Sequence, residues 1–129
     1  MNGEKHAKER DFMSFGMQLE QRGRALIVRL QGELDHHAAD SVRAQMEDAI
    51  LRGNVTHLIL SLKDLSFMDS SGIGVILGRY KMITARGGRM VVCDVSPAVY
   101  RLFEMSGLFK IVSIEQSERE ALSSLGVVS

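Results

Sequence analysis

The sequence predicts an α/β fold consisting of one domain with a mixed, mostly parallel sheet. Three observations support this prediction: the chain has 129 residues, 45% of them are hydrophobic, and short apolar runs alternate with stretches of helical spacing. Strands that alternate with helices favour βαβ crossovers, and therefore parallel strands. We expect about five strands and about four helices, in the order ββαβαβαβα.

The start of the chain differs from the rest. Residues 1–13 are rich in charged side chains and contain no apolar signal core, so we expect a disordered tail there and one domain over 14–129. Both Met1 and Met13 are candidate starts of the natural chain.

The first two predicted strands form a hairpin. Met17 and Leu19 alternate with polar residues, which is typical of a strand. Residues 25–30 are almost continuously apolar, which favours a central strand. Because residues 21–23 leave room only for a tight turn, we expect the two strands to be antiparallel.

A helix and a third strand follow the hairpin. Asp35 stands where an N-cap belongs, and apolar residues recur at helical spacing from there to Gly53. Residues 55–62 are predicted to form the third strand. We expect residues 63–69, which contain charged and polar side chains, to be a loop.

The second half repeats this alternation. A helix is predicted over 70–86, followed by a strand over 90–95. Ser96 and Pro97 are typical of a helix start, and a short strand over 111–114 follows that helix. Ser117 has capping-box spacing to the glutamate three residues later, which predicts a last helix.

In a parallel sheet, functional residues gather at the carboxyl ends of the strands. Three predicted loops meet at that edge, over residues 32–37, 63–71 and 93–97. The middle loop is the most informative, because it continues into the helix start as Asp69-Ser70-Ser71-Gly72-Ile73-Gly74.

Ser70 allows two interpretations. Its hydroxyl can act as a plain N-cap, which spacing alone favours. Alternatively, it is a phosphorylation site, because a helix N-terminus tolerates the charge of about −2 that a phosphoserine carries. We interpret Gly72 as giving a partner access to the hydroxyl, and Asp69 as either orienting that hydroxyl or closing a turn.

Other functions are disfavoured. Sixteen basic and sixteen acidic residues leave no net charge, which argues against nucleic acid or an anionic membrane as a partner. Cys93 is the single cysteine, so a reducing cytoplasm fits best. Gly72 and Gly74 lack the third glycine of a dinucleotide fingerprint, and His36-His37 lacks further ligands. We therefore expect no cofactor, no metal and no catalytic residue.

Several stretches carry a family resemblance. They are Gly-Glu-Leu-Asp-His-His at 32–37, Phe-Met-Asp-Ser-Ser-Gly at 67–72, Gly-Val-Ile-Leu-Gly-Arg-Tyr-Lys at 74–81 and Met-Ser-Gly-Leu-Phe-Lys-Ile at 105–111. On these motifs the chain resembles the STAS domain family over residues 14–129, and within it the anti-sigma factor antagonists.

The resemblance implies a partner-switching function. Its phosphorylated serine falls on Ser70, and its kinase is the nucleotide-bound anti-sigma F factor. The unphosphorylated chain is expected to bind that kinase and release sigma F for forespore transcription, and a serine phosphatase restores the serine. The expected contacts are Asp35, Asp69, Ser71, Gly72, Ile73 and Gly74. Two alternatives stay open: a nucleotide-binding STAS protein, and a stress-response antagonist with other partners.

Overall fold

The computed structural model describes residues 15–127, and its elements follow the predicted order ββαβαβαβα. The tail predicted over 1–13 lies outside the described residues. The elements are β1 (Phe15–Arg22), β2 (Ala25–Leu34), α2 (His36–Arg52), β3 (His57–Met68), α3 (Ser70–Ala85), β4 (Met90–Cys93), α4 (Pro97–Ser106), the short 3-10 helix η1 (Leu108–Lys110), β5 (Ser113–Glu115) and α5 (Glu118–Ser124).

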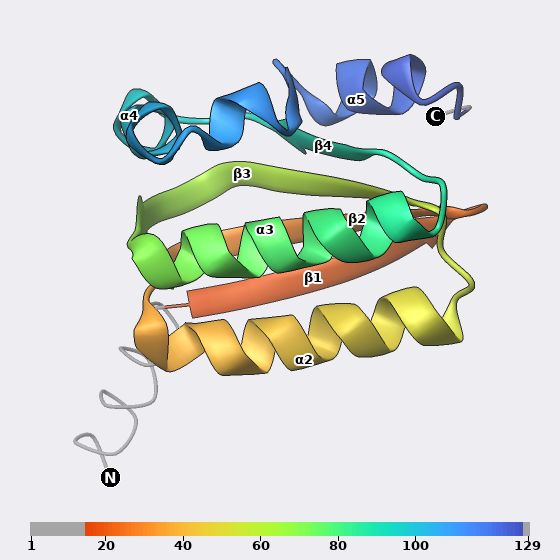
Figure 1. The fold of residues 1–129 in the computed structure, drawn as a ribbon, viewed down its shortest axis with the longest axis horizontal. Helices are drawn as coiled ribbons and strands as arrows, with labels where there is room; N and C mark the ends of the chain where they lie inside the picture. Colours follow the sequence, from red (N-terminus) through yellow and green to blue (C-terminus); the bar gives the residue numbers. More distant parts are fainter. Residues whose placement is uncertain (1–14, 128–129) are drawn as a thin grey trace, which may run out of the picture.

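The five strands form one mixed sheet in the order β1-β2-β3-β4-β5 (Figure 1). β1 pairs antiparallel with β2, and every later pair is parallel. The predicted hairpin and the predicted crossovers are therefore confirmed. No helix among residues 15–127 has the length and apolar character that a bilayer crossing requires.

Helices cover both faces of the sheet. Alternate residues of β2 and β3, such as Val28 and Leu60, belong to the larger core, which the buried residues of α2, α3 and α4 complete. The residues between them, such as Ile27 and Ile59, form a smaller core with Ala121 of α5. The period of two along each central strand thus supplies two apolar faces.

Side-chain caps fix the helix starts. The Ser96 hydroxyl accepts a hydrogen bond from the Val99 amide at 3.3 Å, with Pro97 in the first turn. The Ser117 hydroxyl accepts from the Glu120 amide at 3.2 Å. Each bond satisfies an amide that has no partner within its helix, and both predicted caps are confirmed.

The loop predicted over 63–69 is wrong, because β3 continues to Met68. Leu65 and Met68 are buried, whereas the two residues before each of them are exposed. Four steps along β2, from Arg29 to Glu33, match six steps along β3, from Ser61 to Phe67. The two extra residues are accommodated at bulges, which break the alternation of buried and exposed positions.

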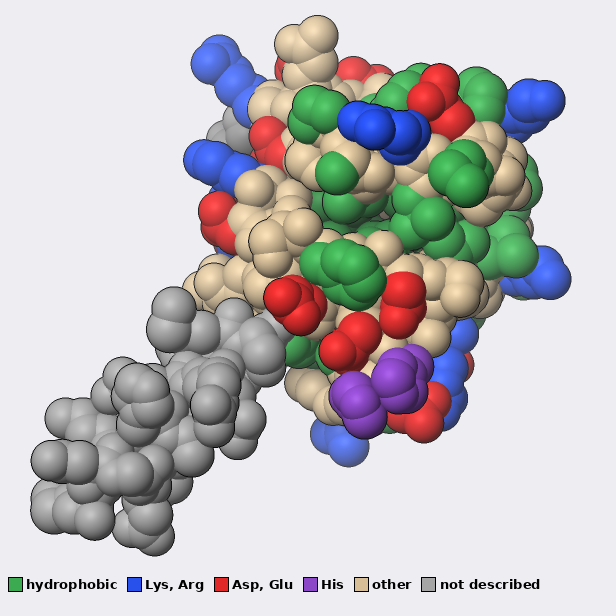
Figure 2. Space-filling model, turned by 90° about the vertical axis from the view of Figure 1, so that its left-hand side faces the viewer, with side chains coloured by type: hydrophobic (Ala, Val, Ile, Leu, Met, Phe, Trp, Pro, Cys, Tyr) green, Lys and Arg blue, Asp and Glu red, His purple; other side chains and the backbone are tan. Residues whose placement is uncertain are grey.

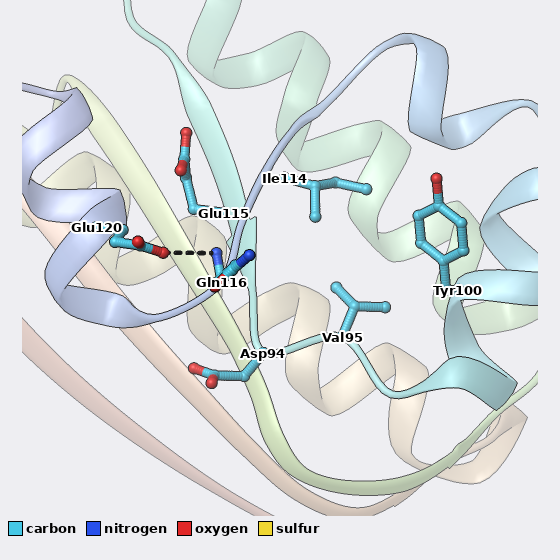
Figure 3. Close-up of a pocket in the computed structure, with 7 residues that line it drawn as sticks. All are labelled: Asp94, Val95, Tyr100, Ile114, Glu115, Gln116 and Glu120. Atoms are coloured by element: carbon cyan, nitrogen blue, oxygen red, sulfur yellow. Dashed lines mark hydrogen bonds between the residues drawn. The ribbon is translucent and has the colours of Figure 1, made fainter.

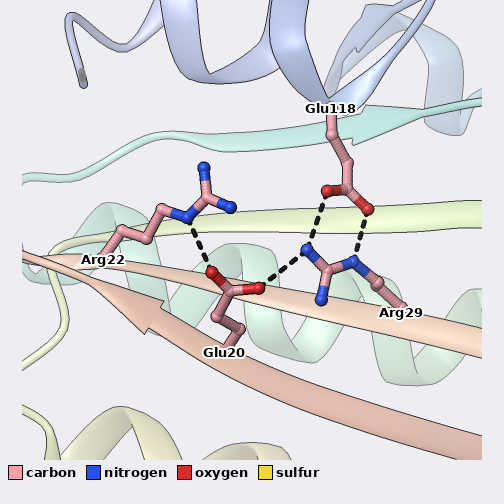
Figure 4. A network of polar contacts seen from close by, with 4 residues as sticks. All are labelled: Glu20, Arg22, Arg29 and Glu118. Carbon is pink, nitrogen blue, oxygen red and sulfur yellow. Dashed lines mark hydrogen bonds and ion pairs between the residues drawn. The ribbon is translucent and has the colours of Figure 1, made fainter. Parts of the chain in front are cut away.

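An ion-pair network ties α5 to the hairpin (Figure 4). Both Glu118 carboxylate oxygens accept from the Arg29 guanidinium, at 2.6 and 2.9 Å. Arg29 also donates to Glu20 at 2.9 Å, and Arg22 donates to the same carboxylate at 2.7 Å. Hydrogen bonding to Glu118 raises the pKa of Arg29. The forked contact fixes how α5 lies over β2.

A second ion pair joins α2 to α3. The side chain of Arg79 is 8% exposed, and its Nη2 donates to Glu47 at 2.9 Å. Within the described part of the chain, Arg79 Nε and Nη1 have no hydrogen-bond partner. Burial lowers the pKa of Arg79. Glu47 is therefore the group that compensates a largely buried charge.

Glu47→Ala should lower the free energy of unfolding by about 1–3 kcal/mol, because Arg79 then stays buried without its partner. The double variant Glu47→Ala/Arg79→Met should recover most of this loss, since methionine fills the space without a charge. Urea denaturation measures both. A double variant less stable than the single variant would show that the buried charge is not the cause.

Candidate functional site

The site begins where two neighbouring strands end together. Leu34 of β2 pairs with Met68 of β3, and each is the last residue of its strand. Asp35 and Asp69 follow directly, and the Asp69 amide donates to the Leu34 carbonyl at 3.3 Å. As a result, α2 and α3 begin side by side at one edge of the sheet, on the left in Figure 1.

Both aspartates are helix N-caps. Asp35 Oδ1 accepts from the amides of His37 and Ala38, at 3.0 and 3.1 Å, which confirms the predicted cap. The bond from the Ala38 amide is the main cause that lowers the pKa of Asp35. Asp69 Oδ1 accepts from the Ser71 amide at 2.8 Å. Asp69, and not Ser70, therefore caps α3.

This assignment corrects the interpretation of Ser70 as a plain N-cap. Ser70 is the first residue of α3, its side chain is exposed, and none of the hydrogen bonds found among the described residues uses its hydroxyl. Because the neighbouring carboxylate takes over the capping, the Ser70 hydroxyl is left accessible at a helix N-terminus, where the amide dipoles favour a negative charge.

Gly72 and Gly74 differ in environment. Gly72 is buried, and a Cβ there would lie 3.1 Å from Leu34 Cδ2, 3.0 Å from Met68 Sδ and closer still to Met68 Cγ. The interpretation that Gly72 admits a partner is therefore wrong: its missing side chain makes room for Met68. Gly74 is exposed, and a Cβ there would meet no atom within 4 Å. Of these two glycines, Gly74 is the one whose backbone is exposed.

The other predicted contacts lie at the two neighbouring helix starts. Asp35, Asp69, Ser71 and Ile73 are half-buried around the starts of α2 and α3. The predicted loop over residues 93–97, however, follows a strand that ends before this edge of the sheet is reached. β4 ends at Cys93 opposite Ser61, seven residues before the end of β3. The sheet therefore brings together the ends of two strands, not of three.

Further candidates lie near this edge or beyond it. His36 and His37 are exposed, with ring centroids 4.0 Å apart, as expected of a solvent-facing pair. Within residues 15–127, no three His, Cys, Asp or Glu side chains are arranged to hold a metal ion. Cys93 is buried, as predicted, and burial raises the pKa of its thiol to about 12.

A separate cavity of about 460 Å³ opens beyond β4 (Figure 3). It lies beside the chain that leaves β4 and between α4 and α5, and its lining includes Asp94, Tyr100 and Ile114. Glu120, at its rim, accepts from the Gln116 amide at 3.2 Å. None of the predicted site residues lines this cavity.

The chain is similar to several known proteins. The STAS domain model matches residues 16–121. The anti-sigma F factor antagonist of Paenibacillus polymyxa is 58% identical over 117 residues, which cover 91% of this chain and 100% of that protein.

Two solved structures are also similar. The anti-sigma factor antagonist SpoIIAA in its unphosphorylated form is 39% identical, with a TM-score of 0.77 over 88% of this chain and 100% of that one. The Bacillus cell fate determinant SpoIIAA in its phosphorylated form is 40% identical, with a TM-score of 0.69 over 84% of this chain and 98% of that one.

The two glycines provide a matched pair of variants. Gly74→Ala should raise the free energy of unfolding by about 1 kcal/mol, because alanine favours a helix and the site is open. Gly72→Ala should lower it by about 1–3 kcal/mol, because Met68 and Leu34 would have to move. Thermal unfolding measures both, and shifts of the same sign would contradict the role assigned to Gly72.

Proposed function

The chain belongs to the STAS domain family, and we propose that it is an anti-sigma F factor antagonist whose binding is switched off by phosphorylation of Ser70. The unphosphorylated chain binds the nucleotide-bound anti-sigma F factor and thereby releases sigma F for forespore transcription. Phosphorylation ends the complex, and a serine phosphatase restores the hydroxyl. The chain acts in the cytoplasm and contributes no catalytic residue.

The observation that carries this proposal is the free hydroxyl of Ser70. A phosphate acceptor has to be exposed, and it has to be released from structural hydrogen bonds before it can attack. Ser70 meets both conditions, because it is exposed and Asp69 supplies the cap of α3. The relative with 58% identity is an anti-sigma F factor antagonist, which supports the same assignment.

The helix start explains how the switch leaves the fold intact. A phosphoserine adds a charge of roughly −2 at neutral pH. At the first position of α3 that charge lies beside the positive end of the helix dipole, and outside the core. The domain keeps its structure, and the added charge acts on whatever covers the edge.

The kinase is the partner itself. The sequence contains no Walker-type lysine pattern, so the nucleotide has to come from outside the chain. A kinase places the γ-phosphate in line with the attacking oxygen, so the complex holds the nucleotide phosphates near Ser70. After transfer, the phosphoserine lies opposite the two phosphates that remain on the nucleotide, in an interface from which water is excluded. Repulsion and desolvation then weaken the complex.

The contacts proposed around Ser70 follow from the paired helix starts. Asp35 and Asp69 present carboxylates, whereas Ser71, Ile73 and Gly74 present the first turns of α3. Figure 2 shows this edge face on, with acidic and histidine side chains below a band of hydrophobic ones. The partner surface is therefore expected to carry basic groups opposite the aspartates.

Incubation with the anti-sigma F factor and ATP should add a single phosphate to the chain, mapped to Ser70 by mass spectrometry. Ser70→Ala should accept none, because the neighbouring Ser71 is half-buried and Ser70 is the exposed serine at this helix start. Ser71→Ala is the matched control and should still be phosphorylated. A phosphate on Ser70→Ala would disprove the assignment.

Ser70→Asp should unfold at about the same temperature as the wild type, yet bind the anti-sigma F factor at least about tenfold more weakly. The reason is that a negative charge is tolerated at the helix start but not in the interface. Ser123→Asp adds the same charge to an exposed position on α5 and should bind normally. Calorimetric titration measures affinity. An unfolded Ser70→Asp would contradict the mechanism.

A further inference from the structure

A hydrophobic groove lies next to the Ser70 edge. It has a volume of about 300 Å³ and runs between the end of β3 and α4. Its apolar lining residues are Phe67, Met68, Ala98, Val99, Leu102 and Met105. In Figure 2 hydrophobic side chains surround a hollow on this face, above the acidic side chains. We call it the β3–α4 groove.

Two of its residues are unusually exposed. Met105 is 82% exposed and Phe67 is 47% exposed. Neither side chain points into the core. Phe67 lies at a bulge of β3, between the buried Leu65 and Met68. Met105 lies on the side of α4 opposite the one that buries Phe103. Exposed apolar side chains gathered around a hollow are typical of a protein-binding surface.

The groove adjoins the Ser70 site. Met68 lines the groove and is the last residue of β3, and the exposed Ser70 follows it by two residues at the start of α3. Stable protein interfaces bury about 800 Å² on each partner, which is much more than one hydroxyl and its neighbours provide. A protein that covers Ser70 closely enough for phosphoryl transfer therefore extends over adjoining surface, and the groove is the apolar part of it.

The charged residues at the rim of the groove indicate what kind of partner surface would bind there. Glu33 pairs with Phe67 across the strands and is exposed, while Asp35 and Asp69 follow the same two strand ends. On the other side Arg101 of α4 lines the groove. A complementary surface thus presents an apolar side chain with a basic group on its β2 side.

We propose that the β3–α4 groove receives an apolar side chain of the anti-sigma F factor, flanked by a basic group that faces Glu33. This inference rests on the function proposed above. The groove is the anchor of the complex, and Ser70 is its switch. The anchor does not change on phosphorylation, so it sets how tightly the kinase holds the chain, whereas the hydroxyl sets whether transfer occurs.

The test uses Met105→Lys and Phe67→Ser, with Leu51→Lys as the matched control. Leu51 is 62% exposed near the end of α2, away from the helix starts. Affinity for the purified anti-sigma F factor is measured with a non-hydrolysable ATP analogue, and thermal unfolding verifies that each variant is folded. Each groove variant should bind at least about tenfold more weakly, as expected of a central interface residue, and Leu51→Lys should bind like the wild type.

Kinetics of Ser70 phosphorylation give an independent measurement. Met105→Lys should raise KM with little change in kcat, because the groove contributes binding and not the geometry of transfer. The inference would be wrong if the wild type binds the anti-sigma F factor and both groove variants bind it with the same affinity. The proposed function would not be affected by that result. Failure of the wild type to bind would instead refute the proposed function. If Met105→Lys abolished a dimer of this chain without changing affinity, the groove would be a self-association surface, and the inference would be wrong.

Discussion

The parallel pairing of β2 with β3 continues well past the end of β4, and the site depends on where it stops. Two bulges give β3 two more residues than β2 between Arg29 and Glu33, so that the strands finish opposite each other at Leu34 and Met68. Two helices then start from adjacent positions, each capped by an aspartate. A different register would separate the aspartates and leave Met68 without its place beside Gly72.

The same edge combines three kinds of surface in a small area. Asp35 and Asp69 supply fixed negative charge, Ser70 supplies a hydroxyl that takes no part in capping, and Phe67 with Met105 supplies apolar surface. The two helices that begin at this edge, α2 and α3, are joined by the ion pair of the largely buried Arg79 with Glu47. The proposed phosphorylation of Ser70 would therefore add charge outside the packing that supports the edge.

The sequence was sufficient for the element order, the mixed sheet and the caps at Asp35, Ser96 and Ser117, because each depends on local chemistry. The end of β3 was not predicted, because the bulges place two exposed residues before each buried one. That pattern lacks the alternation of a strand and is typical of a loop. The roles of Asp69 and Gly72 depend on contacts that the chain makes only when folded. In Asp-Ser-Ser-Gly either the aspartate or the first serine can be the cap, and spacing favoured the serine. The burial of Arg79 gives no signal in a sequence, where an arginine on a helix is normally exposed.

The direction of β1 has a practical consequence for fusion proteins. Because β1 is antiparallel to β2, its first residue, Phe15, pairs with Gly32 near the end of β2. Polypeptide that precedes Phe15 thus joins the domain at the end of the sheet where α2 and α3 begin, whereas α5 ends toward the opposite side (Figure 1). An affinity tag or fluorescent label fused directly before Phe15 would therefore lie beside the edge that we propose binds the partner. The same addition after α5 would leave that edge open, which makes the carboxyl terminus the better attachment point for immobilising this chain on a sensor surface.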